Sequence, residues 1–555
     1  REKRKYFMKL LKKMSALLVA VVMMAVTVVP ALADSITVNN DFNGRTFEAY
    51  QIFKGEKVEG ESGEDANTLV GIEWGNGIDH NTFLNALKSQ DSSNPFRTAF
   101  ANATTAADVA NVLKNWGQLN DLNAIAFAQL AYQHRIGSEA KPFTDGKLEN
   151  IDPGYYLIVD TSTNLDEGEA KNPAILKVVG DEVVTPKAPT IPLDKKVKGE
   201  NDSSFLDDTT SCVGKIVDFQ FTTTVPDQTQ LNQYTVYKWV FTDTMTKGLK
   251  PVTNNDGTLK VEIKLGETTL TDGFIVSAIS GNEKTGSSFT ITFDNLKTID
   301  EVAGKVLTVS YQAEVTEEAI GNTDGTVDKV ENNVKLEYSN NPNDTTSTDD
   351  IKDKVTVFTF QLEGTKVNNK DHDDTLSGAE FMLYKTVKDS DPVAKEYAVI
   401  DTTGKITKWE TLTDAEVTEY LKNKEKEGYN GPNYTITSGE DGKFNVYGLG
   451  NGTYYLQETK APDGYQIKND PFTIVINSTQ NNHQLNSLTI QLDSNEEKPG
   501  ETTTGIVKGD FENTSSITLP ETGGMGTTLL YVAGGILLIG SAVLLVTKKR
   551  MGHEN

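Results

Sequence analysis

Cysteine is almost absent from this sequence of 555 residues, in which Cys212 stands alone. No disulfide can therefore form within the chain. Histidine is also rare, and the five histidines are scattered along the whole length. Without a cluster of His and Cys ligands there is no basis for a metal centre. We expect neither a metal nor any other cofactor.

Basic residues are outnumbered by acidic ones, 53 to 79, which gives a formal net charge of −26. This charge keeps the chain soluble and argues against nucleic acid or an anionic membrane surface as a partner. The sequence also offers no Ser/His/Asp set, no paired-carboxylate cleft and no metal site. We therefore do not expect an enzyme that acts on outside substrates.

Long apolar runs are confined to the two ends of the chain. Residues 1–13 are basic, residues 16–29 are apolar, and a small-x-small triplet ends at Ala33. This order predicts a secretory signal peptide rather than a spanning helix. Met8 is a candidate start of a more compact signal, and we expect the exported part to begin at Asp34. An exported chain without disulfides must be stabilised in another way.

The second apolar run, residues 529–546, is about long enough to cross a bilayer as a helix, so it predicts a transmembrane segment. The basic residues that follow it, 548–550, favour the cytoplasmic side. A Ser/Thr/Gly-rich stretch precedes the run and is not expected to fold. It contains the pentapeptide Leu519, Pro520, Glu521, Thr522 and Gly523.

The pentapeptide, the apolar run and the basic tail together resemble the LPXTG cell-wall sorting signal of Gram-positive surface proteins, here residues 517–555. The resemblance implies that a sortase cysteine attacks the Thr522 carbonyl and releases Gly523 with everything after it. The acyl group then passes to an amine. The resemblance implies that the protein is secreted and covalently anchored to the cell wall.

The chain between the two signals is long enough for about three domains. We expect a signal peptide and three modules, with these boundaries: 1–33, 34–187, 188–357 and 358–516. The first module has strand-like ends, 47–53 and 154–159, and apolar residues at helical spacing in 83–87 and 106–132. We interpret it as a sandwich with a helical insertion.

The second and third modules show short alternating strands that are separated by Gly, Asn and Asp turns. This pattern is typical of an antiparallel β-sandwich. A lysine- and glutamate-rich insertion in the third module, residues 411–428, predicts an exposed helix. The predicted fold class is therefore mainly β, with tandem Ig-like sandwiches.

Two lysines share the inward phase of a predicted strand. Lys366 alternates in register with Phe360 and Leu362, and Lys195 with Ile191 and Val197. A lysine that faces the core is costly unless it is paired or neutralised. A bulge that returns the lysine to solvent is the ordinary alternative.

The third module carries a segment, residues 454–465, that resembles the E-box of Gram-positive pilins. Its Glu458 also faces inward by strand phase. Two further segments, residues 378–381 and 441–444, match strand starts of the collagen-adhesin type B (CnaB) domain. In that family a first-strand lysine forms an isopeptide bond with an asparagine of the last strand. The resemblance thus implies a bond between Lys366 and Asn513, with Glu458 as the catalytic acid and Asn477 as the alternative acceptor.

The chemistry of such a bond follows from burial. A low-dielectric core favours a neutral amine, which is nucleophilic, and a protonated carboxylic acid, which can polarise the amide. Attack of the amine on the Asn Cγ expels ammonia. The product joins strands that lie far apart in the sequence.

The second module repeats the scheme with an aspartate. Residues 239–245, followed by Gly248, resemble the strand that carries the catalytic Asp of the related type A (CnaA) domains. The resemblance implies a bond between Lys195 and Asn332, assisted by Asp243. Asn333 and Asn340 are alternative acceptors. The ordinary interpretation of Asp243 is a turn cap.

The first module has a weaker version of the motif. Residues 154–160 look like a degenerate E-box with Asp160 in place of the usual Glu. Lys54 follows an early strand but no asparagine matches it. We therefore assign no bond to this module.

The amine that receives the Thr522 acyl group is expected at the junction of the first two modules. Backbone pilins supply it from a lysine of a pilin motif, an upstream Trp and then Val-Tyr-Pro-Lys. Here Thr185 replaces the Tyr and the Trp is missing, whereas Pro186 and Lys187 are retained. The resemblance therefore assigns the nucleophile to Lys187, in a proline-rich extended segment. Ordinary solvated charge is the alternative for this lysine.

Over nearly its whole length the chain resembles the major (backbone) pilin of Gram-positive sortase-assembled pili, with CnaA- and CnaB-type sandwiches. The partners implied are a pilus-specific class C sortase, a housekeeping sortase, identical pilin subunits, minor tip or basal pilins, a peptidoglycan precursor and a host surface ligand. The alternative is a monomeric wall-anchored adhesin that is not polymerised.

Overall fold

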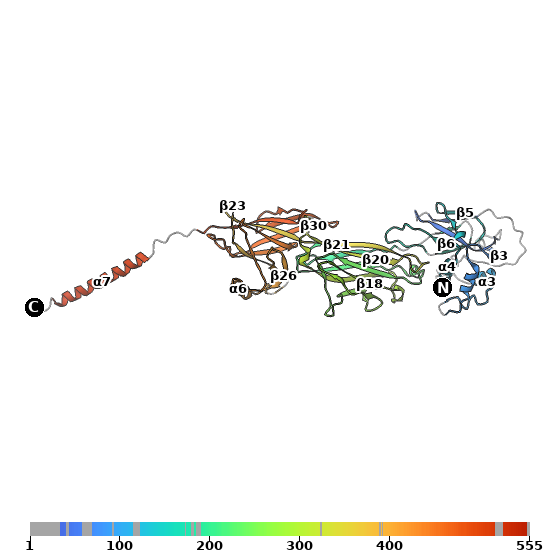
Figure 1. Cartoon of the computed structure of the whole chain (residues 1–555), viewed down its shortest axis with the longest axis horizontal. Helices are drawn as coiled ribbons and strands as arrows, with labels where there is room; N and C mark the ends of the chain where they lie inside the picture. Colours follow the sequence, from blue (N-terminus) through green and yellow to red (C-terminus); the bar gives the residue numbers. More distant parts are fainter. Residues whose placement is uncertain are drawn as a thin grey trace, which may run out of the picture.

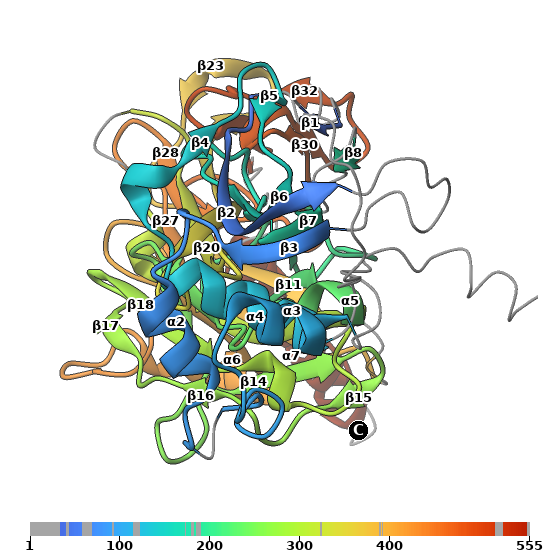
Figure 2. The same ribbon diagram turned by 90° about the vertical axis from the view of Figure 1, so that its right-hand side faces the viewer.

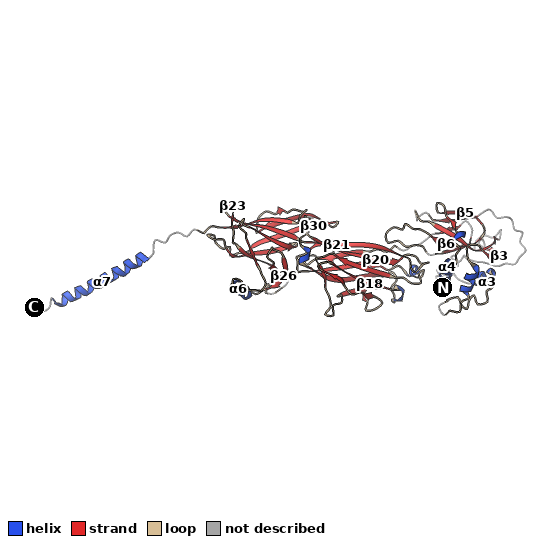
Figure 3. Cartoon of the chain, viewed as in Figure 1, coloured by secondary structure: helices blue, strands red, loops and turns tan. Residues whose placement is uncertain are grey.

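The computed structural model describes these residues: 34–39, 44–57, 69–91, 94–114, 122–172, 174–178, 182–184, 190–321, 325–387, 390, 392–516 and 525–551. The predicted signal peptide lies outside them. Three β-rich units follow one another along the molecule, and helix α7 (Met525–Met551) comes after them in the sequence (Figure 1). Strands dominate all three units (Figure 3), so the predicted mainly-β fold class is confirmed.

In its described residues, the first unit combines two sheets with the α-helices α2, α3 and α4. One sheet has the strand order β5-β1-β8, and the other has the order β3-β2-β6-β7 with β4 paired to β2. The elements are β1 (Asp34–Val38), β2 (Phe47–Lys57), β3 (Leu69–Trp74), α2 (His80–Leu87), α3 (Ala106–Leu113), α4 (Leu122–Gln133), the 3-10 turn η1 (Gly137–Glu139), β4 (Lys141–Pro142), β5 (Lys147–Ile151), β6 (Gly154–Asp160), β7 (Ile175–Val178) and β8 (Glu182–Val184).

The helices cover one side of the larger sheet of this unit, as the end-on view shows (Figure 2). Phe83 of α2, Val109 of α3 and Phe127 of α4 are fully buried in one apolar cluster. A capping box between Thr105 and Asp108 satisfies the first backbone donors of α3. The apolar residues at helical spacing thus form two separate helices, α3 and α4.

The middle unit is a sandwich of two sheets whose strands pair antiparallel, except that β10 runs parallel to β21. Their strand orders are β10-β21-β20-β12-β18-β16, with β17 on β18, and β15-β14-β19-β11-β9, with β13 on β19. The elements are β9 (Asp194–Lys198), β10 (Asp208–Thr210), β11 (Ile216–Thr224), α5 (Gln228–Leu231), β12 (Trp239–Met245), β13 (Leu249–Pro251), β14 (Val261–Leu265), β15 (Thr268–Thr269), β16 (Ile275–Val276), β17 (Ser280–Asn282), β18 (Gly286–Phe293), η2 (Leu296–Thr298), β19 (Val306–Val315), η3 (Glu317–Ala319), β20 (Lys329–Ser339) and β21 (Thr348–Phe358).

The last unit is a second sandwich, with strand order β23-β22-β28 plus β33 on β22 in one sheet and β26-β25-β24-β29-β30-β31-β32 plus β27 in the other. The elements are β22 (Phe360–Asn368), β23 (Asp371–Thr375), β24 (Glu380–Thr386), β25 (Lys395–Ile400), β26 (Ile406–Thr411), α6 (Asp414–Asn423), β27 (Thr435–Thr437), β28 (Lys443–Leu449), β29 (Gly452–Lys460), β30 (Phe472–Asn481), β31 (Gln484–Leu492), β32 (Lys498–Pro499) and β33 (Ile506–Asn513). The predicted exposed helix is confirmed as α6.

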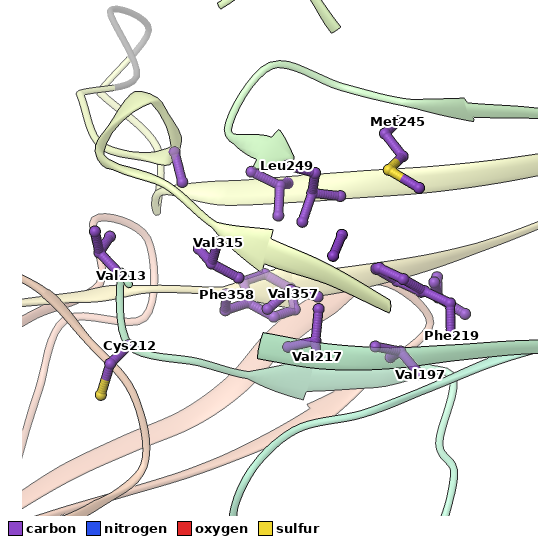
Figure 4. Packing of buried hydrophobic residues seen from close by; sticks show 14 of the residues in the cluster. Val197, Cys212, Val213, Val217, Phe219, Met245, Leu249, Val315, Val357 and Phe358 are labelled. Atoms are coloured by element: carbon purple, nitrogen blue, oxygen red, sulfur yellow. The ribbon is translucent and has the colours of Figure 1, made fainter. Parts of the chain in front are cut away.

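The middle and last units share one apolar core. Strand β21 leads into β22 with only Thr359 between them, and Val357, Phe358 and Phe360 belong to a single buried cluster that spans both units. Figure 4 shows this part of the core around Phe358. Because the chain passes directly from one sheet to the next, the two sandwiches are held against each other by core packing as well as by the backbone.

The C-terminal helix α7 contains the apolar run 529–546 that was predicted to cross the membrane. Among the residues that the structure describes, no helix combines the length and the apolar character that a bilayer span requires.

Candidate functional site

Lys366 lies in the core of the last unit. Its strand β22 buries Phe360, Leu362 and Gly364 on the same face, and the lysine itself is fully inaccessible to solvent. The ammonium nitrogen is 4.9 Å from the centre of the Phe472 ring. The alternation of the strand therefore carries Lys366 inward, and the bulge that would expose it does not occur.

Three side chains from three strands meet around this nitrogen. Lys366 Nζ donates to Asn513 Oδ1 at 2.7 Å and lies 3.2 Å from Glu458 Oε1. Asn513 Nδ2 donates to the same Glu458 oxygen at 3.0 Å. The first and last strands make this possible, because β22 and β33 run parallel as neighbours with Asn368 opposite Asn513.

Burial sets the charge state of the Lys366 amine. Removal from water lowers the pKa of Lys366 to about 8, although the neighbouring Glu458 carboxyl opposes this change. Glu458 is itself 2% exposed, and its Oε2 accepts a hydrogen bond from the Lys468 backbone N–H at 2.7 Å. A neutral, nucleophilic amine is thus accessible near neutral pH, in contact with an amide and a carboxyl group.

The alternative acceptor, Asn477, is not near this cluster. It lies on β30 immediately after the buried Ile476, and its side chain is exposed. Of the two asparagines considered from the sequence, the structure brings only Asn513 to Lys366.

A second cluster lies in the middle unit. Lys195 of β9 is fully buried, and its Nζ is 2.5 Å from Asp243 Oδ2 of β12, which is 1% exposed. The two residues come from opposite sheets, so their contact crosses the interior of the sandwich. Burial lowers the pKa of Lys195 and raises the pKa of Asp243, which favours the neutral forms of both groups.

Asn332 completes this cluster through a residue that the sequence analysis did not identify. Asn332 Nδ2 donates to the Tyr311 hydroxyl at 2.9 Å, and Lys195 Nζ donates to the same hydroxyl at 2.7 Å. Tyr311 in turn donates to Asp243 Oδ2. The signal for Tyr311 was its inward phase on β19, since the hydroxyl of a buried tyrosine usually has a polar partner.

Two oxygen atoms of this cluster have no donor. Asp243 Oδ1 and Asn332 Oδ1 are both buried and have no hydrogen-bond partner among the described residues. A proton on the Asp243 carboxyl would convert one of these acceptors into a donor. The orphaned oxygens therefore agree with a protonated Asp243.

The other two candidate acceptors of the middle unit point elsewhere. Asn333 follows Asn332 on β20 and faces the opposite side of the strand. Asn340 lies beyond the end of β20, where its Oδ1 accepts a hydrogen bond from Ser347 at 2.7 Å and its carbonyl accepts from the Lys171 N–H of the first unit.

The first unit shows a different arrangement. Asp160, the aspartate of the degenerate E-box, is buried and lies 2.8 Å from Arg45 Nη1 and 2.8 Å from Asn172 Nδ2. Lys54 is half exposed and pairs with Glu73 on the surface at 2.9 Å. The structure therefore does not bring Lys54 to Asp160, and the buried cation in this unit is an arginine.

The remaining predicted site residues lie outside the described part of the chain. These are Lys187 and the sorting pentapeptide Leu519, Pro520, Glu521, Thr522 and Gly523.

Three stretches of the chain match family models. Residues 213–342 match the Gram-positive pilin backbone subunit 2, Cna-B-like domain, residues 360–490 match the SpaA prealbumin-like fold domain, and residues 512–551 match the LPXTG cell wall anchor motif. We expected type A likeness in the middle module, whereas the model that it matches is described as Cna-B-like.

Two curated proteins are similar to the chain. One is the trypsin-resistant surface T6 protein of Streptococcus pyogenes serotype M6, with 26% identity over 398 residues, which is 64% of this chain and 68% of the relative. The other is the fimbrial subunit type 1 of Actinomyces viscosus, with 23% identity over 366 residues. That match covers 61% of each protein, so the chain spans less than two thirds of this second relative.

Among solved structures, the T6 backbone pilin of serotype M6 Streptococcus pyogenes is similar in fold. The TM-score is 0.50 at 16% identity, and the match covers 88% of this chain and all of the other. That pilin has a modular three-domain structure.

These matches define a class of wall-anchored surface proteins that are built from β-sandwich domains. Within that class, the matches support a backbone pilin of Gram-positive bacteria. It is a secreted, cell-wall-anchored component of a surface pilus. The proteins of this family are structural subunits and not enzymes.

The buried Arg45–Asp160 pair generates a prediction about stability. We expect Arg45→Gln to lower the free energy of unfolding of the first unit by about 3–5 kcal/mol, because Asp160 would be left buried without its cation. Lys54→Gln, at the exposed ion pair with Glu73, should cost less than about 1 kcal/mol. Urea unfolding followed by hydrogen exchange of first-unit peptides measures both. Equal effects of the two variants would contradict the role given to Arg45.

Proposed function

We propose that this backbone pilin is polymerised head to tail, with the Thr522 carbonyl of one subunit joined to the Lys187 amine of the next, and that its sandwiches are cross-linked internally. The observation that carries the internal cross-links is the Lys366 cluster. There a buried amine with a lowered pKa lies 2.7 Å from an asparagine oxygen, and one carboxyl group contacts both partners.

In the last unit the reaction joins Lys366 Nζ to Asn513 Cγ. The neutral amine attacks the amide carbon, the Cγ–Nδ2 bond breaks, and Nδ2 leaves as ammonia with the proton that the amine gives up. Glu458 contacts both nitrogens, so it can stabilise the developing charge and carry that proton. The reaction needs no cofactor and occurs once in the last unit and once in the middle unit.

The middle unit supports the same reaction between Lys195 and Asn332, with Asp243 as the acid. Its three groups are each at most 1% exposed. Exclusion of water strengthens the electrostatic contacts and keeps the amide from competing hydrolysis.

The cross-links connect residues that are distant in the sequence. A covalent bond between Lys366 and Asn513 would enclose nearly all of the last unit in one loop. Pulling on the two ends of the unit could not extend the chain inside this loop, and the bond would hold the unit together against proteolysis. The name of the T6 relative describes it as trypsin-resistant. Cross-linked sandwiches would give this chain the same property.

Assembly requires two enzymes outside this chain. A class C sortase cleaves after Thr522 and passes the acyl group to Lys187 of the next subunit, and a housekeeping sortase transfers the last subunit to a peptidoglycan precursor. The proposed module boundaries 34–187, 188–357 and 358–516 put Lys187 at the junction of the first two modules. Minor pilins and a host ligand complete the assembly.

The mass of the chain tests the internal cross-links. We expect residues 34–516 to lack two ammonias, about 17 mass units each, with linked peptides that contain Lys366–Asn513 and Lys195–Asn332. Asn513→Ala and Asn332→Ala should each restore one ammonia. Asn477→Ala is the matched control and should keep both bonds. An unmodified mass of the wild-type chain would remove the internal chemistry from the proposal.

The pKa of Lys366 predicts how the rate of bond formation depends on pH. A chain recovered unfolded from insoluble aggregates should form the Lys366 bond faster as the pH of refolding rises. The neutral fraction of the amine increases about tenfold per pH unit until it levels off near the pKa of about 8. Intact mass after an acid quench gives the rate. A rate that does not change from acidic to alkaline pH would contradict the neutral-amine mechanism.

Polymerisation is tested in cells that express the chain with a class C sortase. Wild-type chain should give ladders of high molecular weight, and Lys187→Ala should abolish them because the acyl acceptor is lost. Lys196→Ala, which removes a partly exposed lysine of β9 that pairs with Asp194 and Asp207, should leave the ladders intact. Ladders that persist without Lys187 would refute the assigned acceptor. Failure of the wild type to form ladders would favour the monomeric wall-anchored adhesin.

A further inference from the structure

The hydroxyl group of Tyr311 lies at the centre of the Lys195 cluster. It accepts hydrogen bonds from Lys195 Nζ at 2.7 Å and from Asn332 Nδ2 at 2.9 Å, and it donates to Asp243 Oδ2. Its oxygen thus contacts the attacking nitrogen, the departing nitrogen and the acid. The residue is 3% exposed.

The cluster in the last unit shows why a hydroxyl is required here. In that cluster, Glu458 alone reaches both nitrogens, at 3.2 Å from Lys366 Nζ and 3.0 Å from Asn513 Nδ2. Aspartate is shorter than glutamate by one methylene group. In the middle unit the Asp243 carboxyl contacts Lys195 directly, and Asn332 Nδ2 donates its hydrogen bond to the Tyr311 hydroxyl.

We propose that Tyr311 is a catalytic residue of the Lys195–Asn332 reaction and relays the proton from the attacking amine to the departing amide nitrogen. This inference rests on the cross-linking function proposed above. It extends that function to Tyr311, whose hydroxyl makes the contact with the departing amide nitrogen. In the last unit the longer side chain of Glu458 makes this contact itself.

The relay is balanced in atoms and electrons. The electron pair of Lys195 Nζ forms the new bond to Asn332 Cγ, and the electrons of the Cγ–Nδ2 bond go to Nδ2. The Tyr311 hydroxyl turns from Asp243 Oδ2 to Nδ2 and gives Nδ2 its proton, and in the same step the Tyr311 oxygen takes one proton from Nζ, so that the charge of the Asp243 carboxyl does not change. Ammonia leaves, and Tyr311 and Asp243 return to their starting forms.

The surroundings of Tyr311 fix its ring for this role. The ring stacks on Phe219 with centroids 5.6 Å apart and meets the edge of Phe289 at 5.2 Å. Burial and the Asp243 carboxyl hold the pKa of the phenol well above its usual value. The group therefore stays a neutral phenol, which can accept and donate protons within one hydrogen-bonded network.

Removal of the Tyr311 hydroxyl group tests the relay. The mature chain, residues 34–516, is refolded from insoluble aggregates as wild type, Tyr311→Phe and Tyr237→Phe, and peptide mapping follows each bond over time. Tyr237 is a matched control because it is a fully buried tyrosine of the same sandwich whose hydroxyl has no partner among the described residues. We expect Tyr311→Phe to slow the Lys195–Asn332 bond by about 100-fold and Tyr237→Phe to leave it unchanged.

The bond of the last unit separates the possible failures. It should form at the wild-type rate in all three chains, which shows that folding and general chemistry are intact. A Lys195–Asn332 bond that forms equally fast in Tyr311→Phe and wild type would overturn the relay while leaving the proposed function in place. A wild-type chain without the Lys195–Asn332 bond would instead overturn the cross-linking function of the middle unit.

A second measurement covers the case in which Tyr311→Phe does not fold. Full replacement of tyrosine by 3-fluorotyrosine keeps every hydroxyl and nearly every contact but makes the phenols more acidic. A relay through Tyr311 predicts a changed rate for the middle bond and an unchanged rate for the Lys366–Asn513 bond. Equal rate ratios for both bonds would contradict it.

Discussion

The costly burial of an amine is the constraint on which both sandwiches depend. Lys195 and Lys366 are fully inaccessible, and a charged ammonium in such a place is tolerated only beside a carboxyl group or in neutral form. Each sandwich meets this demand with one acid and one asparagine that arrive from other strands. The partners must come from distant parts of the sequence, because neighbours along one strand alternate between faces. The same constraint that makes the lysine expensive also makes it nucleophilic.

Strand periodicity made part of both clusters predictable. On β22, β29, β9 and β20 the two-residue alternation carries two lysines, one acid and one asparagine inward with their apolar neighbours, namely Lys366, Glu458, Lys195 and Asn332. Asp243 and Asn513 were assigned from the family resemblance. Mainly-β architecture followed from the same pattern. The choice between Asn513 and Asn477 required tertiary structure, since both lie on strands and only the parallel pairing of β22 with β33 brings one of them to Lys366.

Two polar residues escaped the sequence analysis for one physical reason. Tyr311 and Arg45 act through side chains whose partners come from other strands, and neither belongs to a local motif. Inward phase marked Tyr311 as core, where an aromatic ring is ordinary, and only the positions of the surrounding polar atoms reveal the role of its hydroxyl. Arg45 precedes β2 without any alternating pattern, and its pairing with Asp160 joins residues more than a hundred positions apart. Long-range polar networks of this kind are not encoded in periodicity.

The direct passage from β21 to β22 also decides how the molecule can bend. A hinge needs several residues whose backbone dihedrals are free to turn. Thr359 alone separates β21 from β22, and each of these strands is paired within its own sheet. Thr359 is buried as well, in a core common to both sides. The two sandwiches therefore move together as one rigid body. In a filament of such subunits, bending would be concentrated at the connections between these rigid bodies. The persistence length of the filament would be set by those connections rather than by the sandwiches.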